Sequence, residues 1–138
     1  EKILEATSIS FPYLLDYLLF VKNESEKSNQ SLVVVVEAGW LNQSNWHLNR
    51  KDSNRVASAK GNSAGRNHEV GRKIVEMCKH WNIEVVEQRP LKKCWKGKDG
   101  KITHEELTAF TGITGRTNQD ARDAALIAWI FSGFSIKI

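Results

Sequence analysis

Apolar and polar stretches alternate along the chain in a way that predicts helices and strands in turn. An apolar block over residues 11–21, with Ser10 suited to the N-cap and Pro12 to the first turn, predicts a helix that ends in the polar stretch 23–31. Five apolar residues then run over positions 32–36, and four of them are β-branched. A run this short and apolar predicts a strand buried on both faces, as strands inside α/β sheets are.

A second helix and a second strand follow a long polar stretch. Residues 40–65 are rich in Asn, Ser and basic side chains and are expected to form a loop. Within it, Trp40 and Trp46 suit either base stacking or anchoring of the loop on the protein body, and anchoring is favoured. Apolar residues then recur at helical spacing over residues 66–81, before a short strand over residues 83–86. Strand, helix and strand in this order form a βαβ unit, so the two strands are expected to be parallel in one sheet.

The last part of the chain carries two further helix signals. Thr103 and Glu106 have the spacing of a capping box, which predicts a helix that ends near Gly112. Residues 118–131 predict the last helix. Its inward positions are expected to be Ala121, Ala124, Ala125, Ile127, Ala128 and Phe131. No repeat or domain boundary interrupts the pattern, so residues 1–138 are expected to form a single α/β domain.

Composition predicts a soluble protein of a reducing compartment. The chain has 138 residues, 41% of them hydrophobic, and no apolar run is long enough to cross a membrane. Cys78 and Cys94 have no motif spacing and are interpreted as free thiols, which favours a cytoplasmic location.

Basic residues are concentrated in two segments of a chain whose formal net charge is +4. The first segment covers residues 50–73 and the second covers residues 89–101. Such segments favour a polyanionic partner, of which nucleic acid is the usual example. The alternative is that they are two solvated loops with no partner.

Three carboxylates are candidates to meet at one end of the sheet. Glu37 comes directly after the apolar run, and ligands of open α/β sheets bind at strand ends. Asp120 and Asp123 are three residues apart in the last predicted helix, so they share one face of it. Hard oxygen ligands suit Mg²⁺ or Mn²⁺, and two such ions about 4 Å apart promote phosphodiester hydrolysis. The alternatives are a solvated residue at the strand exit and a solvated helix face.

The order of these parts resembles the RuvC-type Holliday junction resolvases of the RNase H-like superfamily. In that family an apolar strand ends in a catalytic Glu, as the run at 32–37 does here. A helix and a short strand ending in Pro follow, as in residues 66–90, and then a Lys-rich segment with Gly, as at residues 92–97. The family closes with Asp-x-x-Asp-Ala, which begins here at Asp120. The resemblance covers the chain from Ser10 to its end.

The resemblance implies an RNase H-like fold, with a mixed central sheet flanked by helices, and a Mg²⁺- or Mn²⁺-dependent endonuclease that cuts branched DNA. Glu37, Asp120 and Asp123 would hold the metal, and Lys92 and Lys93 would contact the scissile or an adjacent phosphate. A homodimer is expected, because a four-way junction presents two related strands, and the helix over residues 66–81 is its candidate contact. The DNA backbone would be positioned by Arg50, Lys51, Arg55, Lys96, Lys98 and Lys101.

The sequence departs from the family pattern in two respects. A further Asp on the family's first, central strand has no counterpart here, so the N-terminal strands are expected to be missing from this sequence or lent by another chain. His104 stands near a catalytic-region Lys of the family; it would assist proton transfer or bind phosphate, and a surface histidine is the favoured alternative. Two other functions stay open, namely a nucleic-acid-binding module that has lost the metal site, and an unrelated α/β protein with structural carboxylates.

Overall fold

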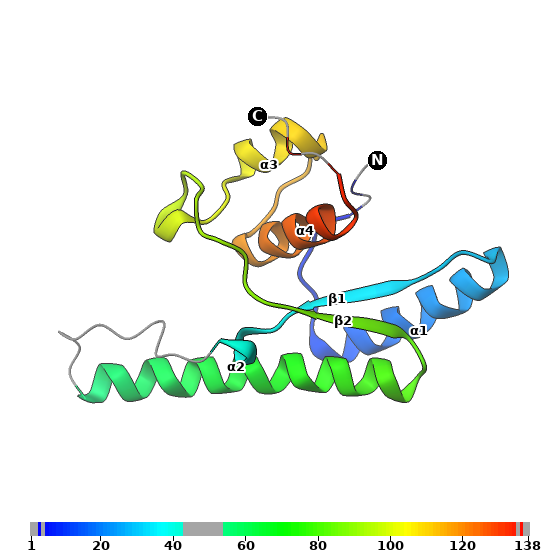
Figure 1. Cartoon of the computed structure of the whole chain (residues 1–138), viewed down its shortest axis with the longest axis horizontal. Coiled ribbons are helices and arrows are strands. Elements are labelled where there is room, and N and C mark those ends of the chain that lie inside the picture. Colours follow the sequence, from blue (N-terminus) through cyan, green and yellow to red (C-terminus); the bar gives the residue numbers. More distant parts are fainter. Residues whose placement is uncertain (1–2, 4, 43–53, 135, 137–138) are drawn as a thin grey trace. The chain divides into compact units, whose positions relative to one another are not determined.

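The computed structural model is an α/β protein. It describes residues 3, 5–42, 54–134 and 136, without the side chains of residues 54–64. Contacts divide the chain into two compact units, which are described one at a time: the sheet unit, Leu14–Pro90, and the terminal unit, Glu1–Tyr13 with Leu91–Ile138. The elements are α1 (Phe11–Ser28), β1 (Val33–Glu37), η1 (Gly39–Leu41), α2 (Asn54–His80), β2 (Glu84–Gln88), η2 (Lys98–Gly100), α3 (His104–Thr111) and α4 (Gln119–Phe131) (Figure 1).

The sheet unit is built on two parallel strands, as the strand–helix–strand order predicts. β1 and β2 pair in register from Val33 opposite Glu84 to Glu37 opposite Gln88. The backbone N–H of Ala38 extends the ladder by donating to the carbonyl of Gln88 at 2.7 Å. The α/β class is thereby confirmed, whereas the mixed RNase H-like sheet and the single domain over residues 1–138 stay predictions.

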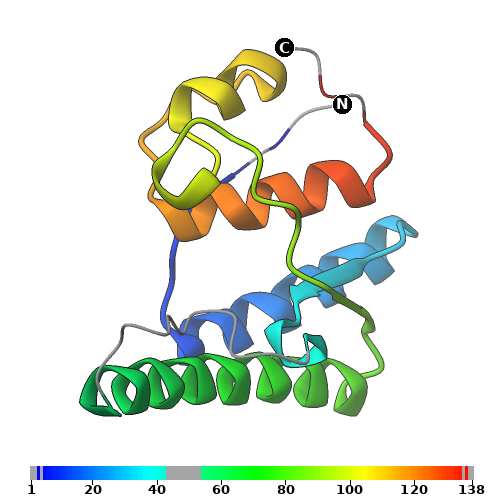
Figure 2. The same ribbon diagram turned by 60° about the vertical axis from the view of Figure 1, so that its left-hand side comes forward.

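Helices α1 and α2 pack against each other and against the sheet (Figure 2). Leu18 of α1 meets the buried Cys78 of α2 and Ile83, and Val34 and Val85 pack against this cluster from the strands. The valines of β1 are partly exposed, so the prediction of a strand buried on both faces is wrong. Alternate residues of a strand face opposite ways, and this helix layer packs on the face that carries Val34 and Val85.

Both helices of the sheet unit are longer than their apolar patterns predict. α1 continues to Ser28 through a polar segment in which Lys22 lies 3.9 Å from Glu26 and Lys27 lies 3.8 Å from Glu24. α2 begins at Asn54, so the prediction of a loop as far as residue 65 is wrong. Neither added segment carries an apolar stripe, and an apolar stripe is what a periodicity argument detects.

Helix α3 of the terminal unit has the predicted ends. The Thr103 side chain accepts a hydrogen bond from the Glu106 backbone N–H, and the Glu106 side chain accepts one from the Thr103 backbone N–H, so the capping box is confirmed. Gly112 ends the helix in the left-handed conformation, at φ 76°, which favours glycine.

The core of the terminal unit joins α3 and α4. Ile102, Leu107, Ala125 and Leu126 are buried together, and Trp95 and Phe110 pack against them. The predicted inward positions Ala121, Ala125 and Ile127 are buried, but Ala124, Ala128 and Phe131 are exposed, so that part of the prediction is wrong. Larger side chains take the inward face of α4 in their place, at Leu126 and Trp129.

Replacing Leu107, whose side chain is fully buried, tests this core. Leu107→Ala is expected to lower the free energy of unfolding by about 2–5 kcal/mol, because it leaves a cavity among well-packed neighbours. Ile130→Ala is the matched control, because Ile130 lies on α4 with 40% of its surface exposed, and it should cost less than about 1 kcal/mol. Urea denaturation followed by circular dichroism measures both, and equal losses would contradict the assigned core.

Candidate metal ligands and nucleic-acid interface

The three predicted metal ligands belong to different units. Glu37 is exposed at the carboxyl end of β1 in the sheet unit, whereas Asp120 and Asp123 lie on α4 in the terminal unit. A site that uses all three therefore stays a prediction. Among the described residues, no three His, Cys, Asp or Glu side chains form a group that would hold a metal ion.

Asp120 and Asp123 lie at the start of α4 in different surroundings. Asp120 is exposed in the first turn, where the positive end of the helix dipole favours a carboxylate. Asp123 is partly buried, and its Oδ1 accepts a hydrogen bond of 2.8 Å from Nε2 of Gln119. The same Gln119 nitrogen donates to the carbonyl of Ile102 at 3.1 Å. One amide group thus fixes Asp123 and connects it to the residue that follows Lys101.

Four hydrogen bonds hold the Arg122 guanidinium in place within the terminal unit. Its Nε donates to the Ile102 carbonyl at 3.2 Å, and its Nη2 donates to Oε1 of Gln119 at 3.1 Å. Its Nη1 donates to the carbonyl of Thr117 at 2.9 Å and to the Thr117 hydroxyl at 3.1 Å. The sequence pattern identified neither Gln119 nor Arg122 as site residues, because their roles depend on a carbonyl that lies about twenty positions away.

The lysine loop, which we define as residues 91–101, doubles back on itself. The Trp95 N–H donates to the Gly100 carbonyl and the Gly97 N–H donates to the Lys101 carbonyl, both at 2.9 Å. A side chain at Gly97 would place its Cβ 2.3 Å from the Lys101 carbonyl oxygen, so the closed form requires glycine. Trp95 stacks on Phe110 with ring centroids 5.9 Å apart, which attaches the loop to the core.

Most of the charged side chains of the lysine loop are exposed to solvent. Four of its lysines are exposed, namely Lys92, Lys93, Lys96 and Lys98, while Lys101 is partly buried. A fixed loop with several exposed ammonium groups creates the positive potential that attracts a polyanion. Of the other predicted DNA contacts, Arg50 and Lys51 lie outside the described residues, and Arg55 lies in α2 without a described side chain.

Glu106 lies beneath the lysine loop. Its carboxylate accepts hydrogen bonds from the backbone N–H of Lys96 at 3.1 and 3.3 Å, from the N–H of Thr103 at 3.1 Å and from the Thr103 hydroxyl at 3.0 Å. Desolvation works against ionisation, but these hydrogen bonds and the charge of Lys96 outweigh it and hold the pKa of Glu106 below its usual value. The carboxylate therefore stays ionised to a lower pH than a free glutamate.

His104 is held by two threonines. Its Nδ1 lies 2.9 Å from the hydroxyl of Thr117, and its Nε2 lies 3.4 Å from the hydroxyl of Thr108. These contacts link the first residue of α3 to the turn before α4. Both ring nitrogens of His104 thus contact a hydroxyl of the chain, and its part in proton transfer or phosphate binding stays a prediction.

Trp40 anchors the chain after β1, as favoured from the sequence. Its Nε1 donates to Oε1 of Glu87 at 3.0 Å, and the Arg72 guanidinium lies 5.6 Å from the ring centroid. The ring also fills the space above Gly71, where a Cβ would lie 2.5 Å from Cζ3 of the indole. The prediction for Trp46 falls outside the described residues.

The two thiols differ in environment. Both cysteines are free; Cys78 is buried among α1, α2 and the strands, whereas Cys94 is exposed in the lysine loop. Burial raises the pKa of the Cys78 thiol, so this sulfur is a packing group and a poor nucleophile.

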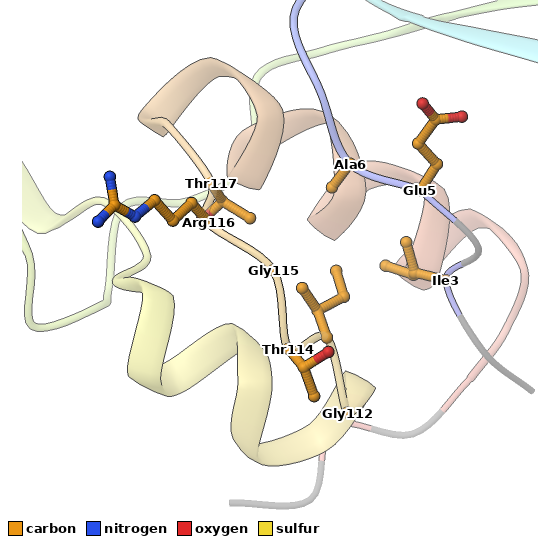
Figure 3. A pocket seen from close by; sticks show the side chains of 9 residues that line it. Ile3, Glu5, Ala6, Gly112, Thr114, Gly115, Arg116 and Thr117 are labelled. Carbon is orange, nitrogen blue, oxygen red and sulfur yellow. The ribbon is translucent and has the colours of Figure 1, made fainter.

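A small pocket of about 260 Å³ lies in the terminal unit, between the N-terminal segment and the turn that joins α3 to α4 (Figure 3). Ile3, Ala6 and Thr114 are among its lining residues. The side chains of Glu5 and Arg116 extend away from one another at its margins, as Figure 3 shows. No predicted site residue lines this pocket, although Thr117, which contacts His104 and Arg122, does.

No protein-family model, curated protein or solved structure matches this chain. The likeness to RuvC-type resolvases therefore rests on the motifs within the sequence. In the part of the chain that the structure describes, no helix is both long and apolar enough to span a bilayer.

The Arg122 contacts predict a sizeable stability loss when the guanidinium is replaced. Arg122→Lys is expected to lower the free energy of unfolding by about 1–3 kcal/mol, because a single ammonium group cannot reach Ile102, Thr117 and Gln119 together. Arg116→Lys is the control, since Arg116 is exposed on the preceding turn. Urea denaturation compares the two variants. Equal midpoints would show that the Arg122 hydrogen bonds do not stabilise the protein.

Proposed function

We propose that this protein is a Mg²⁺- or Mn²⁺-dependent endonuclease of the RuvC-like kind that cuts branched DNA on an RNase H-like fold. The observation that supports this most is the bridge made by Gln119. Its side-chain nitrogen joins Asp123, a candidate metal ligand, to the carbonyl that directly follows the lysine loop, a candidate phosphate-binding element. A nuclease needs both elements, and here they share one hydrogen-bonded network.

The residues present suit a divalent cation. Glu37, Asp120 and Asp123 supply hard carboxylate oxygens, the donors that Mg²⁺ prefers. Gln119 engages Oδ1 of Asp123, and no donor among the described residues takes Oδ2, so the fixed carboxylate keeps an oxygen available for a cation. When bound, such ions would activate water and stabilise the leaving oxygen of the phosphodiester.

The chain's own residues would hold and neutralise the substrate. Lys92 and Lys93 would contact the scissile or an adjacent phosphate, and Lys96, Lys98 and Lys101 would contact the backbone without reading sequence. We also propose a homodimer in contact through residues 66–81, most of which lie in α2, because a four-way junction offers two related strands.

A second candidate function is a nucleic-acid-binding module that does not cut. The lysine loop supports it, because backbone hydrogen bonds and the Trp95 stacking fix the loop independently of Glu37, Asp120 and Asp123. Both candidates require phosphate binding by the loop, and they differ in the role of the carboxylates.

A cleavage assay separates the two functions. Full-length protein with Mn²⁺ is expected to cut a labelled synthetic four-way junction, and Asp123→Asn should reduce the rate by about 100-fold or more through loss of a ligand charge. Asp16→Asn, which changes an exposed carboxylate on α1, should cut at the wild-type rate. Junction binding without cleavage by the wild type would support the second candidate, and equal cleavage by both variants would exclude Asp123 as a ligand.

Salt dependence tests phosphate contact by the lysine loop. Lys98→Gln is expected to weaken DNA binding equally for different sequences and to reduce the slope of log affinity against log salt by about 1. Lys27→Gln, which changes an exposed lysine near the end of α1, should leave that slope unchanged. Fluorescence anisotropy at several salt concentrations measures both variants, and matching slopes would mean that Lys98 contacts no phosphate.

A further inference from the structure

We infer that Glu106 is the positioning residue of the lysine loop, and that its carboxylate holds the loop backbone so that the lysines match a phosphodiester backbone. The choice of ligand rests on the proposed function. The holding of the loop rests on the contacts of Glu106 alone.

The loop uses this carboxylate as the acceptor for one of its own backbone N–H groups. The N–H groups of Trp95 and Gly97, on either side of Lys96, donate to carbonyls within the loop, as do those of Gly100 and Lys101. The N–H of Lys96 donates instead to Glu106, at 3.1 Å to one oxygen and 3.3 Å to the other. Without Glu106, this N–H would lose its protein partner and would donate to water, and the middle of the turn would no longer be tied to α3.

Glu106 also ties the loop to a fixed support. The same carboxylate closes the capping box of α3 through Thr103, so it cannot move without opening the first turn of that helix. Leu107, the next residue, is fully buried in the core. The lysines are thus mounted on a frame that loses little conformational freedom when it binds a ligand.

The negative charge of Glu106 allows a positional role to be distinguished from an electrostatic one. A carboxylate within a loop that binds phosphate lowers the positive potential there and repels the ligand. By electrostatics alone, removing it should strengthen the binding of a polyanion. If it positions the lysines, removing it should weaken binding although the loop becomes more positive. The two roles therefore predict opposite signs for the same substitution.

Four variants of the full chain separate these roles. Glu106→Ala removes both the charge and the acceptor, and Glu106→Gln removes the charge but keeps an acceptor oxygen. Thr103→Ala breaks the capping box but leaves Glu106 free to accept from Lys96. Glu106→Asp keeps the charge with a shorter reach, and it replaces the alanine variant if that variant does not fold.

The readouts are amide hydrogen exchange at Lys96, measured by NMR, and anisotropy with a synthetic four-way DNA junction at two salt concentrations. Glu106→Ala is expected to speed Lys96 exchange and to weaken binding, each by about tenfold, which corresponds to one lost hydrogen bond to a charged group. Glu106→Gln should bind as well as the wild type or more tightly. Thr103→Ala should stay within about twofold of the wild type in both readouts, because its loss is confined to the helix cap.

Three outcomes would overturn the inference. Tighter DNA binding by Glu106→Ala would show that the carboxylate affects binding through its charge and not by positioning the lysines. An equal loss in Thr103→Ala would assign the effect to the helix cap. Unchanged Lys96 exchange in Glu106→Ala would show that the carboxylate does not hold the loop. That last measurement needs no ligand, so it decides the positional role even if the wild type binds no DNA and the proposed function fails.

Discussion

The terminal unit depends on how Ile102 is held. Its side chain is buried beside Leu107, and its carbonyl accepts hydrogen bonds from both Gln119 and Arg122 of α4. A buried carbonyl without partners would cost about 1–3 kcal/mol, so the two donors fix the distance between α4 and the chain that leaves the lysine loop. These two hydrogen bonds to Ile102 link α4, which carries Asp120 and Asp123, to the segment between the lysine loop and α3.

Local signals in the sequence predicted local structure well. The capping box of Thr103 and Glu106 and the glycine stop at Gly112 follow from spacing over a few residues. The parallel pairing of the two strands follows from the strand–helix–strand order. The start of α2 was missed because polar helical turns carry no apolar stripe. Phe131 was placed inward wrongly: helical spacing puts it one turn after the buried Ile127, but at the last position of α4 it is 44% exposed.

The candidate site was predictable as a set of charges but not as a network. The spacing of Asp120 and Asp123 and the clustering of lysines are visible in the sequence, since both are local. The Gln119 bridge and the bond from Lys96 to Glu106 join residues ten or more positions apart in the chain. Contacts of this kind depend on the packing of α3 against α4, which no pattern in a single sequence specifies. Charge counts also mislead, because Arg122 is bound within the fold and Arg72 lies over Trp40.

The shape of the lysine loop and its charge reside in different residues. Gly97 fixes the shape because any Cβ there would collide with the Lys101 carbonyl, and Gly100 adopts φ 76° against the Lys93 carbonyl. The exposed lysine side chains make no contact that closes the loop, which is closed by backbone hydrogen bonds. Changing the charged ends of the side chains at 92, 93 and 98 would therefore leave the hydrogen bonds that close the loop in place. The charge of this loop can thus be varied at those positions while both glycines, and with them the turn, are kept.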